Sequence, residues 1–360
     1  MKKTSIFSAL FAASVLLGTA CKKNNSNETE PSNTGREMMT AFFKQHAPAF
    51  EQFTINAATG GTIVSSKGTK YVIPANSLVD ASGNPVTGNV TISVKELGKA
   101  SDMILGDKPS RTSDGKMLTS YGEFFVRAQQ GNNELQLRRD SAIRANVKPA
   151  NPAGAQFPRE MPLWDGDSAV THTTNGYNHD NQSVTVTSTY YMARGINWNQ
   201  IPGGLVTYNN SNGGYDFRID SLIQWRNCDA LYNPGGVKTT VMGYFGSQFN
   251  TETGRNYMGI EPSMLFFKVR NQNTLVKLYD VILQPAAGKE GLHSYQQSFT
   301  VGEQGTFLAI SCQNGKFYAE MRDVTIAAPA PGTNFTPYSF SLAEVSQTTL
   351  LNLIQQMDTK

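Results

Sequence analysis

Short apolar runs alternate with turn signals along most of this chain, and this spacing limits the folds open to it. The pairs Gly60-Gly61 and Asp114-Gly115 and the run at 131–133 are examples of the turns. Gly and Asn favour turns, whereas the Val, Ile, Thr, Phe and Tyr between them favour strands. Because the turns recur roughly every ten residues, the sequence predicts a mostly β protein with two β-sandwich-like domains.

The predicted strands form two groups, which are separated by a stretch that is rich in proline. The first group is 62–64, 71–73, 90–94, 124–126 and 135–137. The second group is 184–191, 215–223, 239–245, 264–269, 275–283, 306–312 and 316–324. A further predicted strand at 222–228 ends at Cys228. The period of these runs favours strands over helices.

Helical spacing appears near each end of the chain. Apolar residues in 36–53 follow one helical face until Pro48, which predicts a short helix. Near the other end, Ser341 and Glu344 have the spacing of a capping box for a helix over 341–357. We therefore expect a short N-terminal helix and a C-terminal helix that packs against the second domain.

The organisation that these patterns predict has five parts. They are a signal peptide at 1–20, a flexible polar stalk at 21–35, a β-sandwich with its leading helix at 36–148, an inter-domain connection at 149–183 and a second β-rich domain with the C-terminal helix at 184–360.

The first residues have the layout of a secretory signal. A short positive end at 1–3 precedes an apolar run at 4–17, and small residues at 18–20 lie directly before Cys21. The apolar run is too short for a comfortable membrane-spanning helix. A cysteine in this place indicates a bacterial lipoprotein whose Cys21 thiol carries a diacylglycerol, with a further acyl chain (usually palmitate) on the new amine. The alternative is a secreted protein in which Cys21 is incidental.

Charge excludes one class of partner and leaves the location partly open. The formal net charge is +3, and no stretch supplies the basic face that nucleic-acid binding requires. We expect a lipid-anchored protein of the outer membrane. The residues after Cys21 are basic and rich in amides, which slightly favours the periplasmic face over the surface.

Only three cysteines occur in the chain. If Cys21 is lipidated, Cys228 and Cys312 could form a disulfide in an oxidising envelope. The alternative is two separate buried thiols that pack as small apolar residues.

Motifs for hydrolysis or phosphate binding are absent from the sequence, so we expect a protein that is not an enzyme. A catalytic triad needs a histidine, and His46 and His293 are expected in an exposed helix or loop. His172 and His179 accompany Asp165-Gly166-Asp167 and Asp180 in a polar cluster. That cluster could bind a metal ion, but a solvated inter-domain loop explains the same residues more simply, so neither a metal nor another cofactor is predicted.

Aromatic residues gather in the middle third of the chain and suggest a second kind of binding. Trp164, Trp198 and Tyr208 could stack on sugar rings if they were exposed, and Trp198 is the most favourable of them. Otherwise these rings face the core. In addition, Ser141, Ser168 and Ser221 each follow an aspartate and precede an aliphatic residue. This pattern is similar to the O-glycosylation acceptors of Bacteroidota envelope proteins.

Two segments resemble known families. The run Gly60-Gly61-Thr62-Ile63, with 68–78 and 88–92, resembles the opening of ZU5-like β domains, in which a strand ends at an Ile-Pro turn. The run Trp225-Arg226-Asn227-Cys228-Asp229 resembles an element of uncharacterised Bacteroidota lipoproteins, although Gln224 and Arg226 depart from the usual pattern. ZU5-type domains are protein-interaction modules, so the resemblance implies binding and no activity.

The sequence therefore predicts a lipid-anchored envelope protein that binds or assembles with a protein partner. A carbohydrate-binding surface lipoprotein is the alternative. A hydrolase without a visible motif ranks third.

Overall fold

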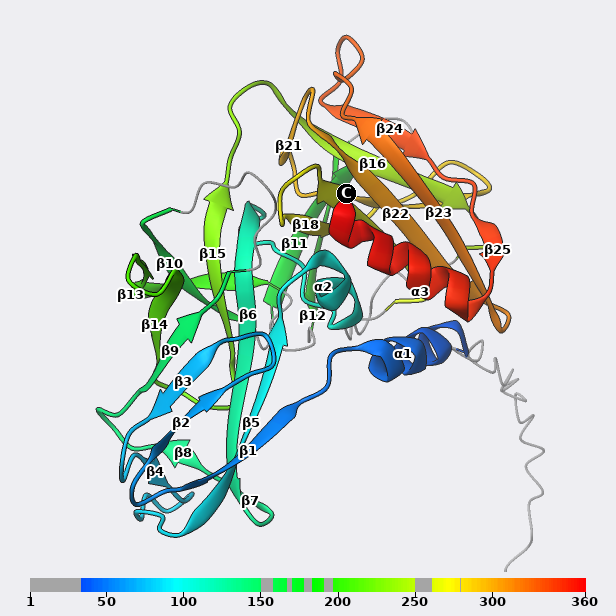
Figure 1. Ribbon diagram of the computed structural model, residues 1–360. Coiled ribbons are helices and arrows are strands. Elements are labelled where there is room, and N and C mark those ends of the chain that lie inside the picture. Colours follow the sequence, from blue (N-terminus) through cyan, green and yellow to red (C-terminus); the bar gives the residue numbers. More distant parts are fainter. Residues whose placement is uncertain are drawn as a thin grey trace, which may run out of the picture. The chain divides into compact units, whose positions relative to one another are not determined.

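We describe the fold from a computed structural model, which covers residues 34–149, 158–166, 170–177, 183–190, 197–249, 261–278 and 280–360 (Figure 1). The protein is mostly β, with several antiparallel sheets, a short helix near its start and a helix near its end. The predicted fold class is therefore confirmed.

The largest sheet, which we call sheet I, has eleven strands within the described residues. Its order is β1 (Glu51–Asn56), β5 (Asn89–Leu97), β6 (Met117–Gln130), β15 (Trp225–Tyr232), β10 (Glu160–Gly166), β13 (Trp198–Asn209), β14 (Gly214–Ile219), β9 (Ile143–Val147), β3 (Lys70–Ile73) and β2 (Gly61–Val64), and β7 (Asn133–Glu134) pairs with β6. The chain turns directly from β1 into β2, with an isolated bridge between Asn56 and Gly60.

Alternating burial in the strands of sheet I builds one apolar core. In β9, Ile143, Ala145 and Val147 are buried, whereas Arg144 is exposed. Alternate side chains of a strand point to opposite faces, so one face of β9 packs in the core and the other faces solvent. Phe217 of β14 joins the same core.

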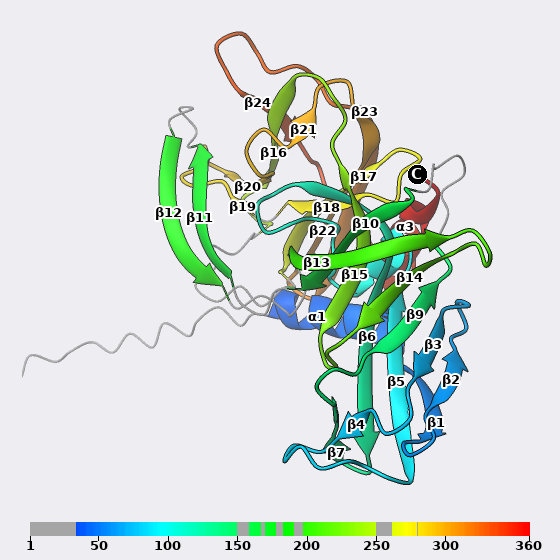
Figure 2. The same ribbon diagram turned by 90° about the vertical axis from the view of Figure 1, so that its left-hand side faces the viewer.

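Two further sheets pack face to face. Sheet II contains β19 (Asp280–Val281), β20 (Lys289–His293), β16 (Lys238–Gly246), β21 (Phe299–Thr300) and β24 (Phe335–Ser339), which runs parallel to β16. Sheet III contains β18 (Leu275–Leu278), β17 (Ser263–Val269), β22 (Gln304–Gln313), β23 (Lys316–Thr325) and β25 (Ala343–Val345). Small pairs are β4 (Leu78–Val79) with β8 (Gln136–Leu137), and β11 (Val170–Tyr177) with β12 (Ser183–Tyr190), seen at the left of Figure 2.

Helices cover the other face of sheet III. They are α1 (Thr34–His46), α2 (Ala100–Leu105) and α3 (Gln347–Gln356), which continues into a 3-10 turn at Met357–Thr359. Phe42, Met103 and Ile354 of these helices pack against Phe266 and Leu308 of the sheet. Every residue of β17 is buried because sheet II covers one face and the helices cover the other. This explains its unbroken apolar run.

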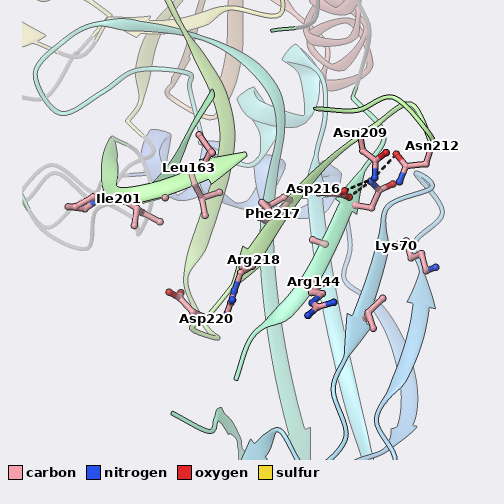
Figure 3. A pocket seen from close by; sticks show the side chains of 17 residues that line it. Lys70, Arg144, Leu163, Ile201, Asn209, Asn212, Asp216, Phe217, Arg218 and Asp220 are labelled. Carbon is pink, nitrogen blue, oxygen red and sulfur yellow. Dashed lines mark hydrogen bonds between the residues drawn. The ribbon is translucent and has the colours of Figure 1, made fainter. Parts of the chain in front are cut away.

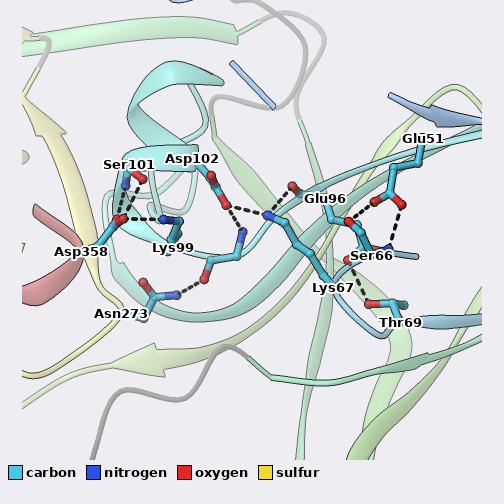
Figure 4. Close-up of polar contacts among 11 residues, drawn as sticks. Glu51, Ser66, Lys67, Thr69, Glu96, Lys99, Ser101, Asp102, Asn273 and Asp358 are labelled. Carbon is cyan, nitrogen blue, oxygen red and sulfur yellow. Dashed lines mark hydrogen bonds and ion pairs between the residues drawn. The ribbon is translucent and has the colours of Figure 1, made fainter. Parts of the chain in front are cut away.

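The helix α2 leaves sheet I between β5 and β6 and packs in the helical layer of sheet III. Ser101 donates two hydrogen bonds to Asp358, from its backbone N at 2.7 Å and from its hydroxyl at 2.9 Å (Figure 4). Lys99 forms an ion pair with the same carboxylate at 2.8 Å. Asn273 also donates hydrogen bonds to the carbonyls of Gly98 and Ser120, each at 2.9 Å. These contacts join sheet I firmly to sheet III.

Sheet I crosses the domain boundaries that the sequence predicts at 148 and 184. The strand β10 lies inside the predicted connection, and β13, β14 and β15 lie inside the predicted second domain. Pro162 is accommodated in β10 because the pairing with β13 is irregular directly after it. Proline has no N–H to donate to a regular ladder, which is why the segment does not resemble a strand in sequence.

The predicted helix bounds also change. The capping box at Ser341 and Glu344 is wrong because Ala343–Val345 pairs with β23 as a strand. Ser346 caps α3 instead, and its hydroxyl accepts a hydrogen bond from the Thr349 N–H at 3.1 Å. Near the other end, the helix stops at His46, and β1 begins inside the predicted helical segment.

Candidate functional site

A groove of about 740 Å³ lies over the solvent face of sheet I (Figure 3). Its floor is formed by β3, β9 and β14, and one wall is formed by the segment Ile201 to Leu205 of β13. Binding sites for small ligands usually have volumes of this order.

The floor of the groove places two arginines directly opposite each other. Arg144 of β9 pairs in register with Arg218 of β14, and Val72 of β3 completes the row. In the next row Lys70 pairs with Asn146, which pairs with Asp216. Cβ atoms of directly opposed residues are only about 5 Å apart, so opposed like charges destabilise a sheet. The arginine pair is therefore a local cost to stability.

The two carboxylates in the groove are engaged with other groups. Asp216 accepts hydrogen bonds from the amides of Asn146 at 2.5 Å and Asn209 at 2.7 Å. Asp220 accepts a hydrogen bond from Arg226 at 2.9 Å. In Figure 3 the amide cluster lies at one end of the groove and the two arginines lie away from it.

The three cationic side chains of the groove are exposed and lack ion-pair partners. Within the described part of the chain, no carboxylate lies within 4.0 Å of Lys70, Arg144 or Arg218. Their donors are therefore available to a ligand. Guanidinium groups hydrogen-bond carboxylates and phosphates in a planar, two-point manner.

The wall of the groove is an irregular segment of β13. Pro162 pairs with Leu205 and Trp164 pairs with Gln200, so four residues of β13 lie opposite one of β10. Gly203 has a φ of 72°, which glycine adopts without strain. The outward bend leaves Leu205 51% exposed beside the arginines. Such bulges often form the edges of binding sites.

The described residues that line the groove are mainly charged, amide and apolar. Among its described lining residues there is no histidine, cysteine, serine or threonine. Acid–base catalysis can also use carboxylates and amines, but Asp216 and Asp220 of the groove both accept hydrogen bonds from neighbouring side chains. The cationic floor and the exposed apolar wall can hold a ligand that carries negative charge and apolar surface.

A second group of polar residues is buried where β6 and β15 of sheet I pair. Glu123 of β6 lies opposite Asn227 of β15, and Asp229 lies opposite Ser120. The Asn227 amide donates to Asp229 at 2.7 Å. Burial raises the pKa of Asp229 to about 7, and burial together with Asp229 raises the pKa of Glu123 well above its ordinary value.

Aromatic side chains of sheet I cover this buried row. The Trp164 indole N–H donates to the carbonyl of Asp229 at 2.8 Å, and the Lys108 ammonium lies 5.3 Å from the centre of the Trp225 ring. Glu123 and Asp229 are completely buried. Because solvent does not reach them, we assign the row to structure and not to ligand binding.

A smaller cavity of about 290 Å³ opens beside α2. Its polar groups are already paired: Lys67 donates to Asp102 at 2.6 Å, and Glu96 accepts from Thr69 at 2.9 Å and from Tyr71 at 2.7 Å. The cavity therefore offers little free hydrogen-bonding capacity to a ligand.

The predicted aromatic residues do not form an exposed platform. Trp164 and Trp198 pack with Leu118 in a small core. The expectation that Trp198 is exposed is wrong, because its ring is fully buried and its N–H donates to the Pro109 carbonyl at 3.0 Å. Tyr208 is half-buried, with its ring centre 5.2 Å from that of Tyr215.

Of the two alternatives for Cys228 and Cys312, the structure has the separate thiols. Cys228 of β15 and Cys312 of β22 are both buried free thiols. Cys228 belongs to the core of sheet I, whereas Cys312 lies between sheet III and the helices. The two strands belong to different sheets, so each cysteine packs as a small apolar residue.

The histidines and the acidic cluster fall in several places. His293 is a buried residue of β20, so the expected exposed loop is wrong, and His46 is the last residue of α1. Asp165 forms an ion pair with Arg226. His172 lies in β11, and Asp167, His179 and Asp180 lie outside the described residues. Within the described residues, no three acidic, histidine or cysteine side chains are grouped so as to hold a metal ion.

The predicted modification sites have two outcomes. Ser141 and Ser221 are half-buried residues that lie between strands. Ser168 and Cys21 lie outside the described residues. The predicted stalk at 21–35 also lies outside them, apart from its last two residues, which begin α1.

Sequence reasoning missed Lys70, Arg144 and Arg218. Each arginine alternates with buried residues in its strand, which is a signal that it faces solvent. That the two arginines face each other depends on the pairing of β9 with β14. The sequence does not show this pairing, because β9 and β14 are far apart in the chain. The hydrogen bond from Asn146 to Asn212 at the edge of this strand pair, for example, joins residues 66 positions apart.

Comparison with protein-family models, with curated proteins and with solved structures gives no match to this chain. None of the helices in the described segments combines the length and the apolar character needed to cross a membrane.

Proposed function

We propose that this protein is a cell-envelope binding module and that the groove on sheet I holds a protein partner. The observation that supports this proposal is the opposed pair Arg144 and Arg218, which lacks ion-pair partners within the described residues. A sheet gains nothing from opposing two like charges. A ligand that carries negative charge would offset their repulsion.

A protein partner fits the groove better than a carbohydrate. Sugar rings commonly stack on exposed aromatic side chains, but no tryptophan or tyrosine is among the described residues that line the groove. Phe217 does line it and is 4% exposed. Leu205 instead presents aliphatic surface beside the cations, as interfaces with proteins commonly do. The hydrolase interpretation finds no support in the lining residues.

Photo-crosslinking in cells that produce the protein tests this proposal. A photoreactive amino acid replaces Leu205 in the groove or, as a control, Val237, which is even more exposed and does not line the groove. We expect a protein adduct from position 205 that is lost when Arg144→Glu and Arg218→Glu are combined, and no such charge-dependent adduct from position 237. If position 205 yields no protein adduct, or one that survives charge reversal, the proposal is wrong.

We further propose that Cys21 anchors the protein to the outer membrane through its acyl chains. Support comes from the apolar run and small residues before Cys21. Each buried CH₂ group contributes about 0.8 kcal/mol, so two or three acyl chains would hold the protein almost permanently. Cys21→Ser should move the protein to the soluble fraction. If that variant stays in the membrane fraction, the anchor proposal fails.

A further inference from the structure

The positions of the cations indicate what part of a partner the groove would take. Lys70, Arg144 and Arg218 lie on the same solvent face, in two neighbouring rows of the sheet. Lys70 is in the row of Asn146, and Asn146 is two residues beyond Arg144 on β9. The rows are therefore about 7 Å apart along the strands, because a strand rises about 3.4 Å per residue.

The same interval separates alternate side chains of an extended peptide. A carboxylate on one residue would reach both arginines, and a carboxylate two residues further along would reach Lys70. The side chain between them would point away from the floor. A helical segment would not match this spacing, because its neighbouring side chains on one face are three or four residues apart.

Resting on the proposed function, we propose that the groove binds an extended acidic segment of a partner protein, with carboxylates on alternate residues. The first carboxylate is held between Arg144 and Arg218, and the second pairs with Lys70. Asp216, which is held by hydrogen bonds to Asn146 and Asn209, lies at the far side of the Lys70 row and would repel a carboxylate placed there, so the second carboxylate lies on the Lys70 side. An apolar residue of the segment packs on Leu205.

Three labelled peptides of equal length test the spacing by fluorescence anisotropy. One carries two glutamates at alternate positions, a second has the same composition with adjacent glutamates, and a third has glutamine in their place. We expect the alternating peptide to bind at least about tenfold more tightly than the other two, as a charge-assisted hydrogen bond allows. Equal binding of the alternating and adjacent peptides would overturn the proposed spacing.

Variants of the protein test the site. Arg144→Gln and Arg218→Gln should each weaken binding of the alternating peptide about tenfold, and Lys70→Gln should reduce its advantage over the adjacent peptide. Arg139→Gln is the matched control, since Arg139 is an exposed arginine that does not line the groove. An equal loss of binding in the control would show attraction to overall charge and would overturn the proposal. Thermal melting curves verify that each variant is folded.

Competition separates other anions from the acidic peptide. Inorganic phosphate or an oligouronate that binds with higher affinity than the alternating peptide would overturn the proposal in favour of a phosphate or an acidic glycan. If no peptide binds but the crosslink at position 205 still depends on the arginines, the acidic-segment proposal fails and the proposed function stands. If that crosslink is also absent, both fail.

Discussion

The Asp107 carboxylate and the Lys277 ammonium are 2.6 Å apart, and both side chains are almost completely shielded from solvent. Asp107 directly follows the turn after α2, and Lys277 belongs to β18. The ion pair therefore links the α2 segment, which connects β5 and β6 of sheet I, to sheet III. Removing Asp107 takes this close partner away from the buried Lys277 ammonium.

Asp107→Asn should destabilise the protein by about 3–5 kcal/mol, which is typical when one member of a buried ion pair is lost. Asp107 has a φ of 50°, a conformation that asparagine also tolerates, so backbone strain would not explain the loss. Urea unfolding measures the change. Glu344→Gln, which breaks the exposed pair with Lys316, is the control and should have little effect. Equal effects of both variants would contradict the importance of the buried pair.

Stability should fall as the pH rises from about 4 to about 7. Asp229 has a pKa of about 7 in the folded protein because it is buried, against an ordinary value near 4, so the folded state binds its proton more tightly than the unfolded state. Glu123 is shifted in the same direction. Asp229→Asn should reduce the slope of the free energy of unfolding against pH by at most about 1.4 kcal/mol per pH unit.

Urea unfolding of this variant at several pH values across that window measures the slope. Glu123→Gln is a matched second variant, and combining both changes should flatten the curve more than either alone. A slope for Asp229→Asn that equals that of the unchanged protein would show that Asp229 does not titrate in this window.

The thiols of Cys228 and Cys312 should not react with a thiol reagent in the folded protein. Burial raises the pKa of both, that of Cys312 to about 11, and the thiolate is the reactive form. In a Cys21→Ser background, both thiols should react once the protein is unfolded without reductant. If a reductant is needed before they react, the two cysteines are paired after all.

Trp198→Ala should lower the free energy of unfolding by about 3–5 kcal/mol, the range found for large aromatic residues in a core. The change removes the packing against Trp164 and Leu118 together with the hydrogen bond to Pro109. Trp198→Phe keeps most of the packing and should cost less. Thermal or urea unfolding distinguishes the two. If the alanine variant is as stable as the unchanged protein, Trp198 is not a core residue.

Runs of strand-forming residues between turn signals predict individual strands better than their partners. The runs at 264–269 and 306–312 correspond to β17 and β22, whose residues are buried on both faces of the sheet. The strand β10 is missed because Pro162 interrupts its ladder, and the start of α3 is misplaced because Ala343–Val345 finds a partner in β23. Long-range pairing decides both outcomes, and a local pattern does not contain it.

The candidate site shows the same limit. The sequence shows that Arg144 and Arg218 alternate with core residues, but their opposition depends on register between distant strands. Trp198 stands among polar residues in the sequence, which suggests exposure. In the structure, the segment around Pro109 covers it. Burial by a remote segment cannot be read from neighbours along the chain.

The placement of α2 bears on the order in which this protein can be completed during synthesis. Ser101 and Asp358 are joined although 257 positions separate them. A ribosome therefore makes α2 long before α3. Met103 and Ile104 share their core with residues of α1 that are already made, but the α3 residues of the same core come last. Contacts of such long range slow folding. Neither sheet I nor sheets II and III can be finished as an independent module, so a fragment of either region should retain exposed apolar surface.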